Sequence, residues 1–186
     1  MTTKRSAVLR ATLRLVSERG FHGAAMSMIA EEAEVGAGTI YRYFASKEDL
    51  ITQLYLEIKR EKGKAFLAGY SEELSLRERF RTLWLNMLHY YMYHPQETAF
   101  LEQFDNSPYM KPEVKEAFAE YYEPLMRFFQ YAFQEGVFKE MPLAMLSTFT
   151  LEVAVSLAKH HASGELTLDD ETKELAMSAT WDALKR

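Results

Sequence analysis

The chain has 186 residues, which suffices for one large core or for a small domain joined to a larger one. It lacks cysteine, which excludes disulfides and thiolate metal sites, and its 48% apolar and 26% charged residues are typical of a soluble globular protein. The net charge of −5 is divided unevenly, because residues 1–64 carry 11 basic and 8 acidic side chains whereas residues 65–186 carry 11 and 19.

This division of charge allows a nucleic-acid contact in the N-terminal part, although such an asymmetry also arises by chance. Positive charge is needed only where a duplex lies. The chain shows no apolar signal-peptide stretch and no run of 18 apolar residues. We therefore expect a cytoplasmic protein without a membrane span.

The first part of the chain predicts three helices. Apolar residues recur at helical spacing over residues 6–19, and Gly20 is expected to end that helix. A short helix is predicted over residues 27–34, with the hydroxyl of Ser27 as its N-cap, and another over residues 39–44. Gly36 is expected to supply the backbone freedom of the turn between these two short helices.

A fourth helix is predicted to begin at Ser46, where Asp49 completes a pattern like a capping box. Further helices are predicted over residues 76–94, 96–104, 112–135, 142–162 and 168–185, with prolines and glycines at most of their ends. Pro124 lies inside one of them and should kink it. No alternating strand pattern appears, so we expect an all-α protein.

Two short helices joined by a glycine-containing turn bury little alone, and they are typical of a helix-turn-helix that places its second helix in the major groove of DNA. Over residues 39–44, Ile40 and Phe44 share one face at i and i+4 and should point to the core. The polar side chains on the other faces suit DNA, because arginine reads guanine edges, threonine touches thymine methyls and tyrosine hydroxyls reach phosphates.

The ungapped stretches R-G-F-H-G-A-A-M-S-M-I-A, residues 19–30, and V-G-A-G-T-I-Y-R-Y-F-A-S-K-E-D-L, residues 35–50, closely resemble the DNA-binding head of the TetR/AcrR family. The resemblance implies an N-terminal three-helix helix-turn-helix head and a C-terminal helical ligand-binding and dimerisation body. The corresponding domains are residues 1–50, with a linker helix over 47–63, and residues 64–186. Ser27 stands where the family usually has threonine, which should preserve both the cap and a phosphate contact. Ala37 stands where the family often has serine, so one hydroxyl that could contact a phosphate is missing.

Carried over residue by residue, the resemblance assigns Ser27, Tyr43 and Lys47 to phosphates, and Thr39, Tyr41 and Arg42 to the major groove or its edge. The alternative for the two tyrosines is that they only cover apolar surface. The expected partner is a palindromic double-stranded DNA operator, which a single small head binds weakly and two heads bind specifically.

The resemblance also implies a homodimer through the last two helices. Two stripes on residues 142–162, one of large apolar and one of small residues, exceed what one core contact needs. We expect the interface to contain Leu146, Phe149, Thr150, Val153, Ala154, Leu157, Ala176 and Ala179. The alternative is a monomer in which these stripes pack inside one bundle.

The middle of the chain is rich in aromatic residues and methionines, which adapt to flat apolar ligands but also fill ordinary cores. The resemblance implies an effector pocket here. The candidates are Trp84, Met87, His89, Tyr91, Phe104, Tyr122, Met126, Phe129 and Glu152, and the expected effector is an apolar or aromatic molecule that can also be cationic.

Other functions find little support in the sequence. No spacing of histidines and carboxylates predicts a metal site, no cofactor is implied, and no nucleophile or phosphate-loop motif predicts an enzyme. We expect a ligand-responsive repressor released from its operator by the effector. An activator, a regulator without an effector and a helical protein-interaction module remain as alternatives.

Overall fold

The computed structural model describes residues 3–186, which form helices joined by turns and one isolated antiparallel bridge between Phe138 and Lys185. These residues pack as two compact units. The first contains the described residues up to 60 together with residues 95–119, and the second contains residues 61–94 and 120–186. None of the helices formed by residues 3–186 is long and apolar enough to cross a membrane.

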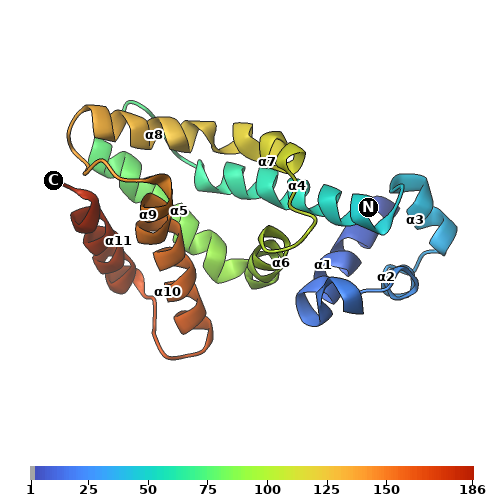
Figure 1. Cartoon of the computed structure of the whole chain (residues 1–186). Coiled ribbons are helices and arrows are strands. Elements are labelled where there is room, and N and C mark those ends of the chain that lie inside the picture. Colours follow the sequence, from blue (N-terminus) through green and yellow to red (C-terminus); the bar gives the residue numbers. More distant parts are fainter. Residues whose placement is uncertain (1–2) are drawn as a thin grey trace. The chain divides into compact units, whose positions relative to one another are not determined.

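The first unit is built around a long helix with two short ones against it. Its helices are α1 (Lys4–Gly23), α2 (Met26–Glu32), α3 (Ala37–Tyr43), the first part of α4 (Lys47–Phe66), α6 (Pro95–Asp105) and α7 (Pro112–Ala119) (Figure 1). Helix α1 packs against α2, α3 and α6. Val8 and Val16 of α1 meet Ile29, Ile40 and Ile51 in a core from which water is excluded.

The end of α1 follows the prediction at Gly20. This glycine has φ 70° and ψ 173°, a conformation that few residues other than glycine adopt, and it interrupts the helix before a last turn that reaches Gly23. Phe21 follows at once and sets its ring edge-on to Phe100 and Tyr109, with ring centroids 5.9 and 5.1 Å away. The glycine therefore turns an aromatic anchor into the core of the first unit.

The second unit is a helical bundle centred on α5 (Leu76–Tyr93). Around it lie the end of α4, the 3₁₀ turn η1 (Glu120–Tyr122), α8 (Glu123–Gln134), α9 (Leu143–Ser147), the π-helical turn η2 (Thr148–Glu152), α10 (Val153–Ala162) and α11 (Asp170–Leu184). Helices α10 and α11 both pack against α5. Ser75 and Glu78 form a reciprocal capping box at the start of α5, which fixes where this central helix begins.

Two of the long predicted helices are divided in the structure. The break near Pro124 is confirmed, because η1 separates α7 from α8 and the proline lies in the first turn of α8, where its missing N–H costs little. The helix predicted over residues 142–162 is not regular throughout. It widens into the π turn η2, inside which the Thr150 hydroxyl donates a hydrogen bond of 2.6 Å to the Leu146 carbonyl.

Candidate nucleic-acid interface

The turn between α2 and α3 begins with a hydrogen-bonded motif that ends α2 and that the sequence did not predict. The N–H of Val35 donates to the Ala30 carbonyl at 2.9 Å and that of Glu34 to the Glu31 carbonyl at 3.0 Å. Glu34 has φ 53°, so it takes the left-handed position that glycine usually fills. The expectation for Gly36 was wrong: its φ is −69°, and it precedes α3 as an ordinary extended N-cap.

The start of α2 also differs from the prediction. Its N-cap is Ala25, which offers no side-chain hydrogen bond, so Ser27 is the second residue of the helix instead of its cap. The Ser27 side chain is exposed. Its hydroxyl is thus not used by a cap and faces solvent near the N-terminal end of α2, where backbone N–H groups favour anions.

Helix α3 separates its core face from its outer face as predicted. Ile40 and Phe44 are 0% and 1% exposed, and Phe44 closes the helix with a backbone hydrogen bond to Ile40. Tyr41 and Tyr43 are 56% and 42% exposed, and Arg42 is exposed as well. Burial of one face leaves the three consecutive side chains 41–43 projecting outward from a helix whose backbone is fixed by the core.

The first turn of α3 carries almost no side chain. Ala37 and Gly38 are exposed, and a methyl group added at Gly38 would meet nothing within 4 Å. Thr39 is half-buried beside them. Small residues at this position allow another molecule to approach the backbone closely. The predicted DNA contacts did not include this feature, because they consisted of polar side chains only.

The start of α4 is capped as predicted, with the Asp49 N–H donating to the Ser46 hydroxyl at 3.1 Å and the Ala45 N–H donating to the Asp49 carboxylate at 2.7 Å. Lys47 is half-buried, and its ammonium donates to the Phe21 carbonyl at 2.6 Å. Burial lowers the pKa of this ammonium. Lys47 therefore fastens α4 to the end of α1, while an ammonium has three N–H donors and can also hydrogen-bond an anion.

The expected effector residues do not all come together. Trp84, Met87, Tyr91 and Phe129 are buried in the core of the second unit and Tyr122 is partly buried against it, whereas Met126 and Glu152 are exposed. Phe104 belongs to the core of the first unit, where its ring stacks on Tyr55 at 3.9 Å. His89 is exposed and lines an open cleft of the second unit.

The buried aromatic group contains one polar atom without a partner. The indole N–H of Trp84 is buried and has no hydrogen-bond acceptor among the described residues. An unpaired buried donor costs free energy that an inserted acceptor would recover. Trp84 was a candidate because of its aromatic ring, and nothing in the sequence around it predicts that its N–H is unpaired.

The expected dimer residues fall on opposite faces of their helices. Leu146, Thr150 and Ala154 are 3%, 2% and 0% exposed within the subunit, so they contact its own core and are not available to a partner. Phe149 and Ala179 are exposed, and Val153, Leu157 and Ala176 are partly exposed. Met145 and Leu175, which sequence reasoning missed, are 47% and 69% exposed beside them.

Residues 8–54 match the model of the bacterial regulatory proteins of the tetR family, and residues 75–185 match the model of a tetracyclin repressor-like C-terminal domain. A solved transcriptional regulator of the TetR family from Vibrio parahaemolyticus is 35% identical, with a TM-score of 0.85 over 99% of this chain and 100% of that one.

Two curated relatives agree with these matches. An uncharacterised helix-turn-helix transcriptional regulator from Haemophilus influenzae is 25% identical over 96% of this chain and 94% of its own length. The transcriptional repressor KstR of Mycolicibacterium smegmatis is 37% identical over 70 residues, which cover 36% of this chain and 34% of the repressor. The chain belongs to the TetR family of bacterial DNA-binding transcriptional regulators and is not an enzyme.

Proposed function

We propose that this regulator is a homodimeric repressor that leaves a palindromic operator when a small apolar or aromatic effector binds its second unit. The observation that carries its DNA contact is the outward row of side chains 41–43 on α3, held by the buried Ile40 and Phe44. Thr39, Tyr41 and Arg42 contact base edges or their surroundings in this proposal, and Ser27, Tyr43 and Lys47 contact phosphates.

The proposal of repression, as opposed to activation, is supported by one relative. KstR of Mycolicibacterium smegmatis, which is named as a repressor, matches 36% of this chain. The proposed domains are a DNA-binding head over residues 1–50, followed by the linker helix 47–63, and an effector-binding and dimerisation body over residues 64–186. The protein acts in the cytoplasm, where bacterial DNA is found.

Effector binding is supported by the buried aromatic side chains of the second unit and by the unpaired indole N–H of Trp84. A carbonyl or ether oxygen of an apolar ligand would accept that hydrogen bond and stabilise the arrangement that admits it. Such a ligand releases DNA only if it binds the DNA-free arrangement more tightly than the DNA-bound one.

Selection of bound sequences from random duplexes tests the DNA contact directly. We expect an inverted repeat whose half-sites are separated by about one helical turn, roughly 34–36 Å, or a multiple of it. Affinity for the selected duplex should fall steeply with salt. A selection that returns no enriched sequence, with binding that salt does not weaken, would refute the proposed function and favour a protein-interaction module.

A further inference from the structure

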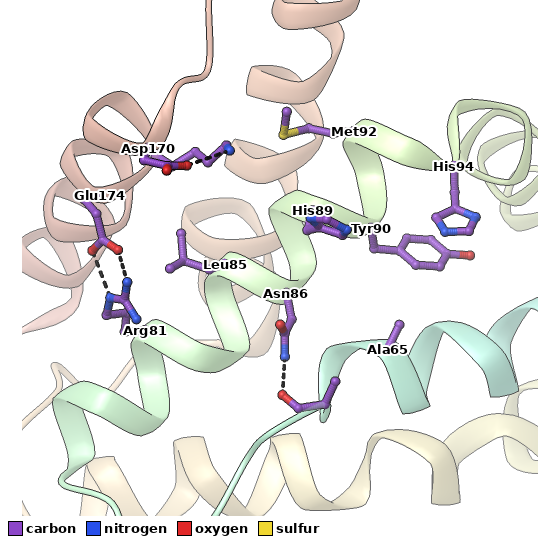
Figure 2. A pocket seen from close by; sticks show the side chains of 12 residues that line it. Ala65, Arg81, Leu85, Asn86, His89, Tyr90, Met92, His94, Asp170 and Glu174 are labelled. Atoms are coloured by element: carbon purple, nitrogen blue, oxygen red, sulfur yellow. Dashed lines mark hydrogen bonds and ion pairs between the residues drawn. The ribbon is translucent and has the colours of Figure 1, made fainter.

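A cleft of about 680 Å³ opens in the second unit between the C-terminal end of α4, the middle of α5 and the first turns of α11 (Figure 2). Its volume lies in the range of small-molecule sites. Of the nine residues that the sequence nominated for an effector, only His89 lines it. The cleft is therefore a different place from the buried aromatic group around Trp84.

The charges of the cleft are paired with one another. Arg81 of α5 donates two hydrogen bonds to the carboxylate of Glu174 on α11, one of them 3.0 Å long, and Lys173 lies 3.2 Å from Asp170 (Figure 2). Each cation thus has a carboxylate beside it. An ionic ligand would have to break one of these pairs, so the cleft favours an uncharged ligand.

Two side chains keep hydrogen-bonding capacity for a ligand. Asn86 donates its amide hydrogens to the end of α4, at 3.0 Å to the Phe66 carbonyl, and to the turn after it, at 2.7 Å to the Ala68 carbonyl. Its own carbonyl oxygen accepts no hydrogen bond from residues 3–186. The imidazole of His89 makes a ring contact with Tyr93 at 4.4 Å, and within the same described range its nitrogens have no hydrogen bond.

Asn86 and His89 stand three residues apart on α5, so their side chains are neighbours on one face of the helix. The free oxygen of Asn86 is an acceptor only, and the imidazole of His89 has an N–H that can donate. A single hydroxyl satisfies both, because its hydrogen can go to the Asn86 carbonyl oxygen while its oxygen accepts from the imidazole N–H.

The rest of the lining suits a flat apolar ring. Leu85 and Met92 line the cleft from α5, and Tyr90 and His94 stack on each other at 4.4 Å with an angle of 13° between their rings (Figure 2). Thioether and aromatic side chains pack well against aromatic ligands. The cleft therefore offers apolar surface for a ring in addition to Asn86 and His89, which can bind a hydroxyl.

We propose that this cleft binds an uncharged aromatic alcohol of the phenol class, with its hydroxyl on Asn86 and His89. Asn86 would accept the hydrogen bond of the ligand's hydroxyl. The same side chain donates an amide hydrogen to the Phe66 carbonyl and so also holds the C-terminal end of α4. The binding itself does not rest on the proposed operator release, and it is measured without DNA.

The test uses the full chain and titration calorimetry at pH 7 with 2-naphthol, naphthalene, 2-naphthoate and 1-naphthylmethylamine. For a ligand of this size, 2-naphthol should bind with a Kd of about 10⁻⁴ M. The hydrocarbon, the anion and the cation should each bind about tenfold more weakly or worse. Equal affinities for 2-naphthol and naphthalene would overturn the proposal, as would a Kd above about 10 mM for 2-naphthol.

Two variants place the ligand. His89→Phe keeps an aromatic ring at this exposed position but removes the nitrogens that can hydrogen-bond a ligand, so it should weaken binding of 2-naphthol about tenfold and leave binding of naphthalene unchanged. Leu85→Trp adds a larger ring to the lining and should abolish binding of all four compounds. Both variants binding 2-naphthol within twofold of the parent would overturn the proposal and direct attention to the buried group around Trp84. Circular dichroism spectra that match the parent verify the fold of each variant.

Discussion

At the scale of single residues, the proposed DNA contacts are of two kinds, those that read the sequence and those that are the same for every sequence. Arg42 projects from the helix that bears the outward row, whereas Lys47 is already bonded to the Phe21 carbonyl. A guanidinium at a base edge discriminates among sequences. An ammonium at the start of a helix contacts phosphates, which are the same in every sequence.

Arg42→Ala is therefore expected to weaken binding to the selected operator by about 1–3 kcal/mol and to relax the preference at one position of each half-site. Lys47→Ala should weaken the operator and random DNA alike. Competition binding on both duplexes measures the difference, with Arg127→Ala, an exposed arginine on α8, as the control that changes neither. An equal loss on both duplexes for Arg42→Ala would show that the guanidinium does not read a base.

Lys59 is a second residue whose surroundings make a measurable prediction. Its ammonium is largely buried over the rings of Tyr55 and Phe118, at 5.0 and 4.7 Å, and lies 3.8 Å from the Asp105 carboxylate. Burial lowers the pKa of Lys59, and Asp105 opposes this only in part. The folded protein thus gives up this proton at a lower pH than the unfolded chain does.

Between the folded pKa and the ordinary lysine value of about 10.4, the unfolded chain binds more protons, so stability rises with pH through that window. Lys59→Met removes this term. At pH 7 we expect the free energy of unfolding of the variant to lie within about 1 kcal/mol of that of the parent. As the pH rises, the free energy of unfolding of the parent should increase relative to that of the variant. Asp105→Ala, which leaves the ammonium without that carboxylate, should cost about 1–3 kcal/mol. Urea unfolding of the parent and the two variants at pH 7 and pH 9.5 measures these differences. A parent that becomes less stable relative to Lys59→Met at pH 9.5 would contradict the predicted direction.

At the scale of elements, helix positions were predictable because apolar spacing, prolines and caps act locally. Gly20, Ser46 and Pro124 each mark a boundary that the structure contains. The turn between α2 and α3 was not predictable, because its left-handed residue is Glu34 and a glutamate gives no local signal for that conformation. Ser27 was misread because α2 begins one residue earlier, at Met26.

The conformation of Glu34 predicts opposite effects for two glycine substitutions. A residue with a Cβ pays about 1 kcal/mol or more in the left-handed region, so Glu34→Gly should stabilise the protein by up to about 1 kcal/mol. Glu31→Gly, inside α2 and also exposed, should destabilise it by about the same amount. Thermal unfolding of the two variants decides the matter, and a loss of stability in both would mean that Glu34 is not strained.

At the scale of the whole molecule, the two packed units do not correspond to two consecutive parts of the sequence. Residues 95–119, which follow α5 in sequence, pack with the helix-turn-helix in the first unit. Phe104 was assigned to the effector region from its place among aromatic residues, yet it stacks on Tyr55 of α4. Aromatic composition predicts burial, but which core a ring joins depends on contacts between distant segments.

The same limit applies to the proposed dimer. The sequence showed a stripe of large apolar residues and a stripe of small ones on residues 142–162 without saying which faces inward. The structure buries Thr150 and Ala154 of the small stripe together with Leu146 of the large one. The outward side keeps Met145 and Phe149, and α11 adds Leu175 and Ala179. Exposed apolar side chains gathered on neighbouring helices are typical of an interface between copies of a chain.

Phe149→Glu and Leu175→Glu are therefore expected to convert the protein to a monomer of 21.6 kDa, because each buries a charge in the proposed interface. Binding of a single half-site should survive, whereas affinity for the full palindrome should drop by about two orders of magnitude or more, since the second head then binds as a separate molecule. Met126→Glu introduces the same charge at an exposed methionine of α8 and should leave both mass and affinity unchanged. Sedimentation equilibrium at micromolar concentration together with operator titration separates the cases. A parent that sediments at 21.6 kDa would reject the dimer, and a dimeric Phe149→Glu variant would move the interface to another surface.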